Sequence, residues 1–183
     1  MHLRRGALAA AAEWIVEVER TGQTEPGVAT TVGRIVVTPG AGNVIPGEAR
    51  VSLDVRHSED AVRLAATVKL LKAAHTIAVR RSITLATDEL LNQPAVPCNA
   101  NLLNLLEASL RKQGHTVHKM GSGAGHDGMI LAEKTPIAML FLRSPGGISH
   151  HPDESVLAPD VDAAIAVGRQ FLFELENELA ARG

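Results

Sequence analysis

The sequence predicts an α/β fold in two parts. Residues 1–86 are expected to form a ferredoxin-like split β-α-β sandwich that lacks its first strand, and residues 87–183 the closing portion of a larger α/β domain. Three observations predict this organisation: alternation of apolar and polar residues over 49–56, helical spacing of apolar residues at both ends of the chain, and a continuous apolar run over 137–142.

The elements of the first part are expected in the order helix, strand, strand, helix, strand. Apolar residues recur with helical spacing from Leu8 until Gly22. The Thr- and Val-rich stretch 28–37 predicts a strand, and residues 49–56 predict a second strand with one apolar face. A helix is expected from Ser58 onward, and alternation over 77–85 predicts a third strand. The apolar positions of that helix include Leu64, Val68 and Leu71.

A split β-α-β sandwich opens with a strand, and no such strand precedes the first predicted helix. Its absence would leave one edge of the sheet without a partner, which folded proteins avoid. We therefore expect either that residues preceding Met1 complete the sheet or that another chain pairs with the open edge.

The second part follows an irregular segment, residues 88–99, that is interrupted by prolines. Asn99 is expected to cap a leucine-rich helix that ends near Gln113. Residues 115–120 predict a short strand, residues 126–133 a short helix, and residues 137–142 a strand buried on both faces. The last helix begins near Pro159. Its predicted buried stripe consists of Val161, Ile165, Gly168, Leu172, Leu175 and Leu179.

The composition excludes several classes of partner and location. With a net charge of −2 and 2% aromatic residues, the chain has neither a basic surface for phosphates nor rings to stack on bases, so nucleic acid is not an expected partner. No stretch approaches the ~20 apolar residues of a membrane span. The single cysteine, Cys98, rules out an internal disulfide and favours a reducing compartment, so we expect the protein in the cytoplasm.

A glycine-rich segment is the first candidate for chemistry. Residues 123–128 match the spacing of a dinucleotide-binding turn, but the helix that follows is cut short by Pro136. The alternatives are a structural tight turn, or a loop of Gly123, Ala124 and Gly125 whose backbone N–H groups face a substrate anion. The nearby Ser122 lacks the strand-turn-helix context of a nucleophilic serine.

Two further segments suit metal and carboxylate ligands. Residues 149–154, Ser-His-His-Pro-Asp-Glu, contain the residue types that bind zinc or manganese, but a solvated polar loop is the alternative. Arg56 is suited to bind a carboxylate through two hydrogen bonds, and Asn43 to donate to one of its oxygens. The alternative for this pair is a capped turn at Asn43 and a solvated arginine at a strand end.

Taken in order, four motifs resemble one family. They are Asn43-Val44-Ile45-Pro46-Gly47, Leu53-Asp54-Val55-Arg56, Ser122-Gly123-Ala124-Gly125-His126-Asp127 and Arg143-Ser144-Pro145-Gly146-Gly147-Ile148-Ser149-His150. With these motifs the chain resembles allantoate amidohydrolases and N-carbamoyl-L-amino-acid hydrolases, in the aminoacylase and carboxypeptidase G-type metallohydrolase superfamily. The resemblance implies that residues 1–86 are a lid and dimerisation domain and that residues 87–183 are the carboxy-terminal part of the catalytic domain.

The resemblance also implies residue roles. His150 matches a metal ligand, Asn43 and Arg56 match residues that hold the substrate carboxylate, and the loop of Gly123, Ala124 and Gly125 matches backbone that lines the pocket. In the intact enzyme two divalent ions, zinc or manganese, would activate a water for attack on the ureido carbonyl. The family's remaining metal ligands and its general base would precede Met1.

The chain alone is therefore expected to bind no metal ion tightly and to be inactive. Its expected partners are a small ureido or carbamoyl acid, a second copy bound through the lid, and a separate amino-terminal catalytic chain. The alternative is a non-catalytic dimerisation or carboxylate-binding module derived from such an enzyme.

Overall fold

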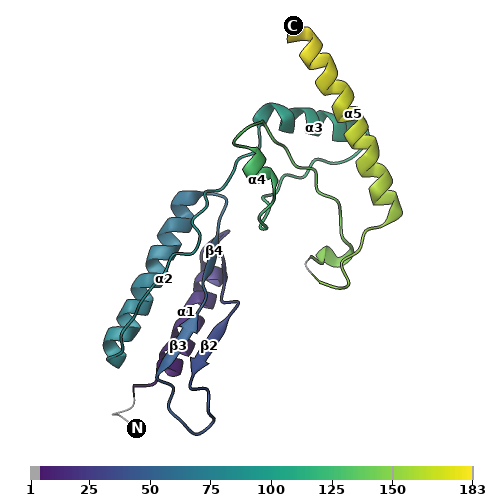
Figure 1. Cartoon of the computed structure of the whole chain (residues 1–183). Coiled ribbons are helices and arrows are strands. Elements are labelled where there is room, and N and C mark those ends of the chain that lie inside the picture. The colour runs from purple at the N-terminus through teal and green to yellow at the C-terminus, as the bar shows by residue number, and fades with distance from the viewer. Residues whose placement is uncertain (1–4, 150, 183) are drawn as a thin grey trace. The chain divides into compact units, whose positions relative to one another are not determined.

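The computed structural model describes residues 5–149 and 151–182 and has a mixed α/β architecture, as predicted (Figure 1). The chain forms two compact units, one ending at Ala95 and the other beginning at Val96. This boundary lies inside the irregular segment 88–99. None of the described helices combines the length and apolar character that a membrane crossing requires.

Unit 1 consists of two helices and a broken β-hairpin. The helices are α1 (Ala7–Thr24) and α2 (Asp60–Arg81), and the strands are β1 (Ala29–Thr31), β2 (Ile35–Thr38), β3 (Glu48–Val51) and β4 (Asp54–Arg56). β1 pairs antiparallel with β4, and β2 pairs antiparallel with β3. The hairpin therefore has one arm made of β1 and β2 and another made of β3 and β4, joined by a loop over 39–47.

Each predicted strand of the hairpin is interrupted once. Between the two paired stretches, Val32 to Arg34 on the first arm lie opposite Ser52 and Leu53 on the second, so the first arm carries one extra residue. Arg34 and Ser52 bridge the break, because the Arg34 N–H donates to Ser52 Oγ at 2.9 Å and the Ser52 N–H donates to the Arg34 carbonyl at 3.0 Å. An unpaired extra residue of this kind is a β-bulge, which bends an arm without ending it.

The alternation predicted for residues 49–56 is confirmed across this break. The apolar residues are partly covered and the polar residues between them are exposed to solvent. The partly covered residues are Ala49, Val51, Leu53 and Val55. α1 contacts β1 and β3 and α2 contacts β4, so the helices cover the apolar face of the hairpin (Figure 1).

The core of unit 1 lies between the two helices. Leu70 is fully buried and Val18 is 2% exposed, and the Trp14 Nε1–H donates to the Leu70 carbonyl at 2.9 Å. The face of α2 that packs inward includes Ala66, Ile77 and Ala78, and the two alanines let the helix axes approach closely. The apolar positions noted in the sequence, Leu64, Val68 and Leu71, lie instead on the exposed side of α2.

Two details of this region differ from the prediction. The prediction of a third strand over 77–85 is wrong, because α2 continues to Arg81. The helix is followed by Ser82, whose φ of 51° is left-handed. Residues 77–81 alternate over too short a stretch to separate strand from helix, and their packing against α1 decides for helix. The expected Ser58 cap is also wrong: α2 begins at Asp60, and Glu59, the residue before it, makes no capping hydrogen bond with its side chain.

Unit 2 is built around a pair of helices. Its elements are α3 (Ala100–Lys112), α4 (Gly128–Leu131), a 3₁₀ turn η1 (Pro145–Gly147) and α5 (Ala158–Arg182). α3 packs against α5. The predicted cap is confirmed, since Asn99 Oδ1 accepts a hydrogen bond from the Leu102 N–H at 3.1 Å. Gly114, with a φ of +78°, follows the end of α3 as expected.

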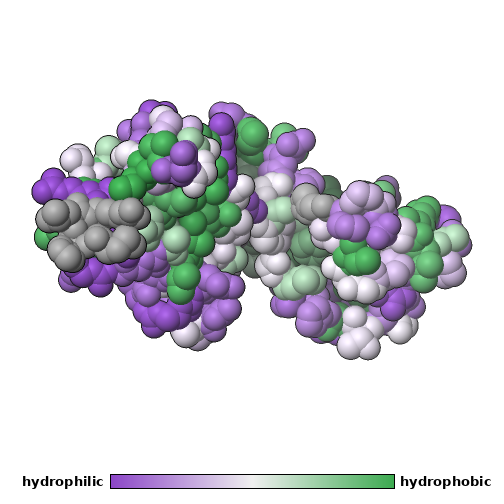
Figure 2. All heavy atoms as spheres, turned by 90° about the horizontal axis from the view of Figure 1, so that it is seen from below, coloured by the Kyte–Doolittle hydropathy of each residue, from purple (hydrophilic) through white to green (hydrophobic). Residues whose placement is uncertain are grey.

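The strands predicted in unit 2 do not form among its described residues. Residues 115–120 and 137–142 have no strand partner there, and a strand without a partner cannot satisfy its backbone groups. The predicted burial of residues 137–142 on both faces is also wrong, because Phe141 is 46% exposed. The stripe predicted for α5 is partly exposed as well, with Leu172 at 63%, whereas Val167 is buried. Figure 2 shows apolar surface on both units.

Candidate functional site

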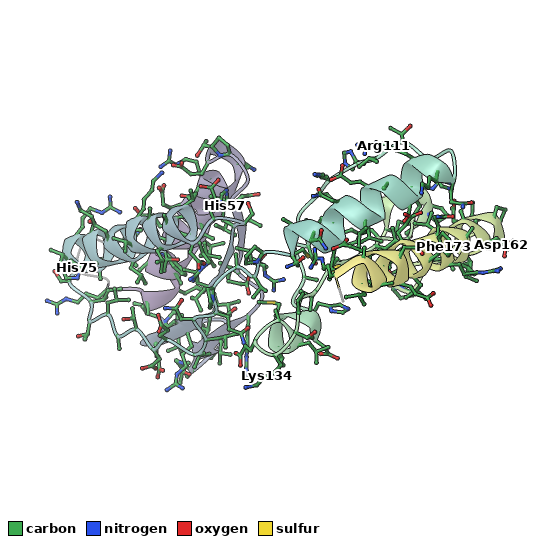
Figure 3. The ribbon with its side chains drawn as sticks, turned by 90° about the horizontal axis from the view of Figure 1, so that it is seen from above. His57, His75, Arg111, Lys134, Asp162 and Phe173 are labelled. Atoms are coloured by element: carbon green, nitrogen blue, oxygen red, sulfur yellow. The ribbon has the colours of Figure 1, made fainter. Side chains whose placement is uncertain are left out.

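Arg56 lies at the end of β4, on the polar face of the hairpin, one residue before His57, which Figure 3 labels. Its guanidinium donates two hydrogen bonds to the carboxylate of Asp54 on the same face, with Nε–Oδ1 at 2.7 Å and Nη2–Oδ2 at 3.1 Å. The hydrogen bond and the charge of Asp54 raise the pKa of Arg56 further above its ordinary value. Arg56 is therefore a permanent cation, half exposed, already arranged in the fork geometry that binds carboxylates.

Asn43 lies exposed in the loop that joins β2 to β3. The loop is closed at its base by the Gly47 N–H, which donates to the Thr38 carbonyl at 3.0 Å, and it contains a turn in which the Val44 N–H donates to the Ala41 carbonyl at 3.2 Å. This geometry presents the Asn43 region beyond the end of the hairpin.

The structure places Asn43 and Arg56 at opposite ends of the hairpin. The second arm runs from Glu48, next to the Asn43 loop, to Arg56. At the ~3.3 Å rise per residue of a strand, the two ends lie roughly 25 Å apart. Figure 1 shows the loop between β2 and β3 projecting away from the β4 end. Within one protomer the two predicted carboxylate-binding residues are not brought together.

The glycine loop of unit 2 precedes α4. The Ser122 hydroxyl donates to the Ala124 carbonyl at 2.9 Å, and the Gly128 N–H donates to His126 Nδ1 at 2.9 Å. A Cβ added at Gly121, Gly123 or Gly125 would meet no atom within 4 Å, so packing inside the unit does not demand glycine there. A side chain could therefore be accommodated at these three positions.

The dinucleotide interpretation of the same loop receives no support. α4 contains only four residues. A dinucleotide-binding turn opens a full helix, whose N-terminus carries the pyrophosphate.

His150, the predicted metal ligand, lies outside the described residues. On its carboxyl side, the Asp153 N–H donates to His151 Nδ1 at 3.2 Å. The base of the segment is closed by an ion pair: Arg143 Nε donates to Asp160 Oδ1 at 3.0 Å, and Asp160 is buried in the first turn of α5. This ion pair ties the two ends of residues 144–159 together.

Residues 5–149 and 151–182 contain no group of three or more His, Cys, Asp or Glu side chains arranged to hold a metal ion. A zinc or manganese site requires three or four such ligands. The described residues therefore do not make a dinuclear metal centre on their own.

One residue near the candidate site was missed by the sequence interpretation. Asp54 was named only within the motif Leu53-Asp54-Val55-Arg56 and was given no role, yet it is the carboxylate that Arg56 contacts. The signal was available, because residues two apart in a strand share a face and an Asp-x-Arg spacing places the opposite charges side by side.

Residues 3–174 match peptidase family M20/M25/M40. The chain belongs to this family. It is 35% identical to an N-carbamoyl-L-amino acid amidohydrolase of Geobacillus stearothermophilus, over 98% of this chain and 43% of that protein. It is 34% identical to allantoate deiminase 2 of Glycine max, over 96% of this chain and 42% of that protein. The M20 chain thus spans about two fifths of the length of these hydrolases.

Solved structures of M20 relatives agree with the fold. A hydantoinase/carbamoylase family amidase from Burkholderia vietnamiensis superposes with a TM-score of 0.85 at 28% identity, over 93% of this chain and 42% of that one. A Bacillus subtilis protein described as a dinuclear metal binding M20 peptidase superposes with a TM-score of 0.64 at 21% identity, over 93% of this chain and 45% of that one. The second likeness concerns the fold alone.

Proposed function

We propose that this chain supplies part of a metal-dependent hydrolase that cleaves the ureido or carbamoyl C–N bond of allantoate or of N-carbamoyl-L-amino acids. The observation that carries the proposal is Arg56, a charged guanidinium in carboxylate-binding geometry at an exposed strand end. Both substrate classes carry a carboxylate, and the relatives named for these substrates match nearly the whole chain.

In this proposal each candidate residue has one role. Arg56 binds the substrate carboxylate and so fixes the position of the scissile bond, Asn43 donates to a carboxylate oxygen, and the backbone of Gly123, Ala124 and Gly125 lines the pocket. His150 is one ligand of a centre of two divalent ions, zinc or manganese. Because the described residues do not complete that centre, we propose that residues 1–183 alone are inactive and that the remaining metal ligands come from polypeptide outside them.

The positions of Asn43 and Arg56 extend the proposal to a homodimer. A small acid cannot touch two residues roughly 25 Å apart in one protomer. We therefore propose that unit 1 is a ferredoxin-like lid and dimerisation domain, and that the Asn43 loop of one protomer approaches the partner subunit's Arg56. Residues 87–183 are then the carboxy-terminal part of the catalytic domain. The lone Cys98 supports a cytoplasmic location.

A chimera tests the function directly. This chain would replace the matching region of the Geobacillus stearothermophilus amidohydrolase, and release of amino acid from N-carbamoyl-L-amino acids would be measured with zinc or manganese. We expect turnover, and we expect Arg56→Ala to lower kcat/KM at least about 100-fold, since a charged anchor is lost. Arg50→Ala, which removes a cation from the same strand face, is the matched control. A folded, metal-loaded chimera without turnover would contradict the proposal.

The alternative is a non-catalytic module that binds carboxylates through Arg56. It rests on the same Arg56 geometry and needs no metal ion. This alternative requires that the chain alone binds N-carbamoylglycine with a submillimolar dissociation constant in calorimetry and that Arg56→Ala abolishes the heat. Turnover by the chimera with only weak binding by the chain would reject it.

A further inference from the structure

The polar face of the second hairpin arm carries two carboxylate–arginine pairs with the same spacing. Glu48 contacts Arg50 with Oε1–Nε at 2.7 Å, and Asp54 contacts Arg56 with Oδ1–Nε at 2.7 Å. The Asp54 pair has a second bond, from Arg56 Nη2 to Oδ2 at 3.1 Å. Arg56 is also the less exposed of the two arginines, at 51% against 82% for Arg50.

Two bonds in one plane restrict a guanidinium more than one bond does. An arginine side chain has many rotamers, and a ligand that binds it must order them. Asp54 holds the Nε–Nη2 edge of Arg56 and so fixes the guanidinium plane relative to β4. A guanidinium has a second edge formed by Nη1 and Nη2, so an arginine bound to one carboxylate has the geometry to meet another.

We propose that Asp54 is a positioning residue that orients Arg56 for the carboxylate of the substrate. The inference rests on the proposed role of Arg56. The change in affinity that it predicts on neutralising Asp54 is opposite to the change that electrostatics alone predicts. The negative charge of Asp54 repels an incoming carboxylate, so electrostatics alone predicts tighter binding when Asp54 is neutralised. Positioning predicts weaker binding.

The test uses the full 183-residue chain labelled with ¹⁵N-arginine. N-carbamoylglycine is titrated in, and the Arg56 Nε–Hε signal, assigned with Arg56→Ala, is followed by NMR. We expect Asp54→Asn to raise the dissociation constant about three- to tenfold, because the side chain must then be ordered by the ligand. We also expect the ligand-free Nε–Hε signal of this variant to report faster motion and faster exchange with water.

Two matched variants separate positioning from charge. Glu48→Gln removes the same charge from the same strand face and is expected to leave affinity unchanged or slightly increased. Asp54→Glu should retain affinity within about twofold, because the Glu48–Arg50 pair shows that a glutamate at this spacing reaches the arginine Nε. Trp14 fluorescence confirms that each variant remains folded.

The outcomes distinguish the role of Asp54 from the proposed role of Arg56. Binding by Asp54→Asn as tight as wild type, or an unchanged Arg56 signal in the ligand-free variant, overturns the role of Asp54 and leaves Arg56 as the anchor. Two results overturn the carboxylate anchor and the inference together. One is that ligand-induced shifts of the other arginine signals persist in Arg56→Ala. The other is that the wild-type chain shows no Arg56-dependent shift at any ligand concentration.

Discussion

Two of the three strands predicted in unit 1 form, whereas neither strand predicted in unit 2 forms among its described residues. In unit 1 the two arms of the hairpin are neighbours in sequence, joined by the loop over 39–47, and they pair along almost their whole length. In unit 2 the predicted strands 115–120 and 137–142 find no strand partner among the described residues, and the helices α3 and α5 provide the packing instead. Both units contain sequences that favour strands.

A strand pattern therefore predicts a preference for extended backbone and does not identify the partner strand. A hairpin closes a short loop at small entropic cost, so its ladder forms from local sequence. A strand of a parallel sheet depends on partners that lie far away in the chain. Without such partners the apolar side chains of the stretch stay exposed, as Leu140, Phe141 and Leu142 are.

The largest effect is expected from the core that unit 1 builds for itself. Leu70 is fully buried between the helices, so Leu70→Ala should lower the free energy of unfolding by about 2–5 kcal/mol. Leu71→Ala, one residue along α2 and 37% exposed, should cost under about 1 kcal/mol. Urea denaturation followed by the fluorescence of Trp14, the single tryptophan, measures both.

The matched pair also tests which face of α2 is buried. Equal losses for Leu70→Ala and Leu71→Ala would contradict a core of unit 1 built on the Leu70 face of α2 alone.

The sequence predicts the features of the fold that depend on neighbouring residues better than those that depend on distant partners. The alternation over 49–56 and the Asn99 cap are local signals, and both are confirmed. The strand over 77–85 was wrong because packing against α1, which the pattern does not contain, extends α2. The buried face of α5 was misplaced for the same reason, since its position is set by α3. The candidate site is less predictable still, because its residues were assigned by resemblance and Asp54, the contact of Arg56, was given no role.

A smaller effect is expected from the cap of α3, the local signal on which unit 2 depends. Asn99→Ala removes the acceptor for the Leu102 N–H and should cost about 1 kcal/mol. Asn104→Ala, at an exposed position inside α3, should be neutral or slightly stabilising, because alanine is the better helix former. Amide hydrogen exchange of the first turn of α3 measures both changes. A larger loss of protection in Asn104→Ala than in Asn99→Ala would contradict the assigned cap.

The smallest effect is a pH dependence that should be common to both units. In each unit a glutamate contacts a lysine of a neighbouring helix: Glu25, just after α1, contacts Lys69 of α2 at 2.6 Å, and Glu174 of α5 contacts Lys112 of α3. In both cases the hydrogen bond from the lysine holds the glutamate pKa below its ordinary value of 4.5. A carboxyl group with a lowered pKa in the folded state stabilises the fold above its unfolded pKa, and this contribution is lost as the pH falls through the folded pKa.

We therefore expect the denaturation midpoints of both units to fall as the pH is lowered below about 4.5. Glu25→Gln should flatten this dependence in the Trp14 signal, and Glu174→Gln should flatten it in the hydrogen exchange of α5. The change should be larger for Glu174, because Gln170 Nε2 also donates to its carboxylate, at 2.6 Å, and strengthens the preference for the charged form. A pH dependence untouched by either substitution would place its origin in other carboxyl groups. A change in one unit only would mean that the helix pairs of the two units are stabilised differently, as their strands are.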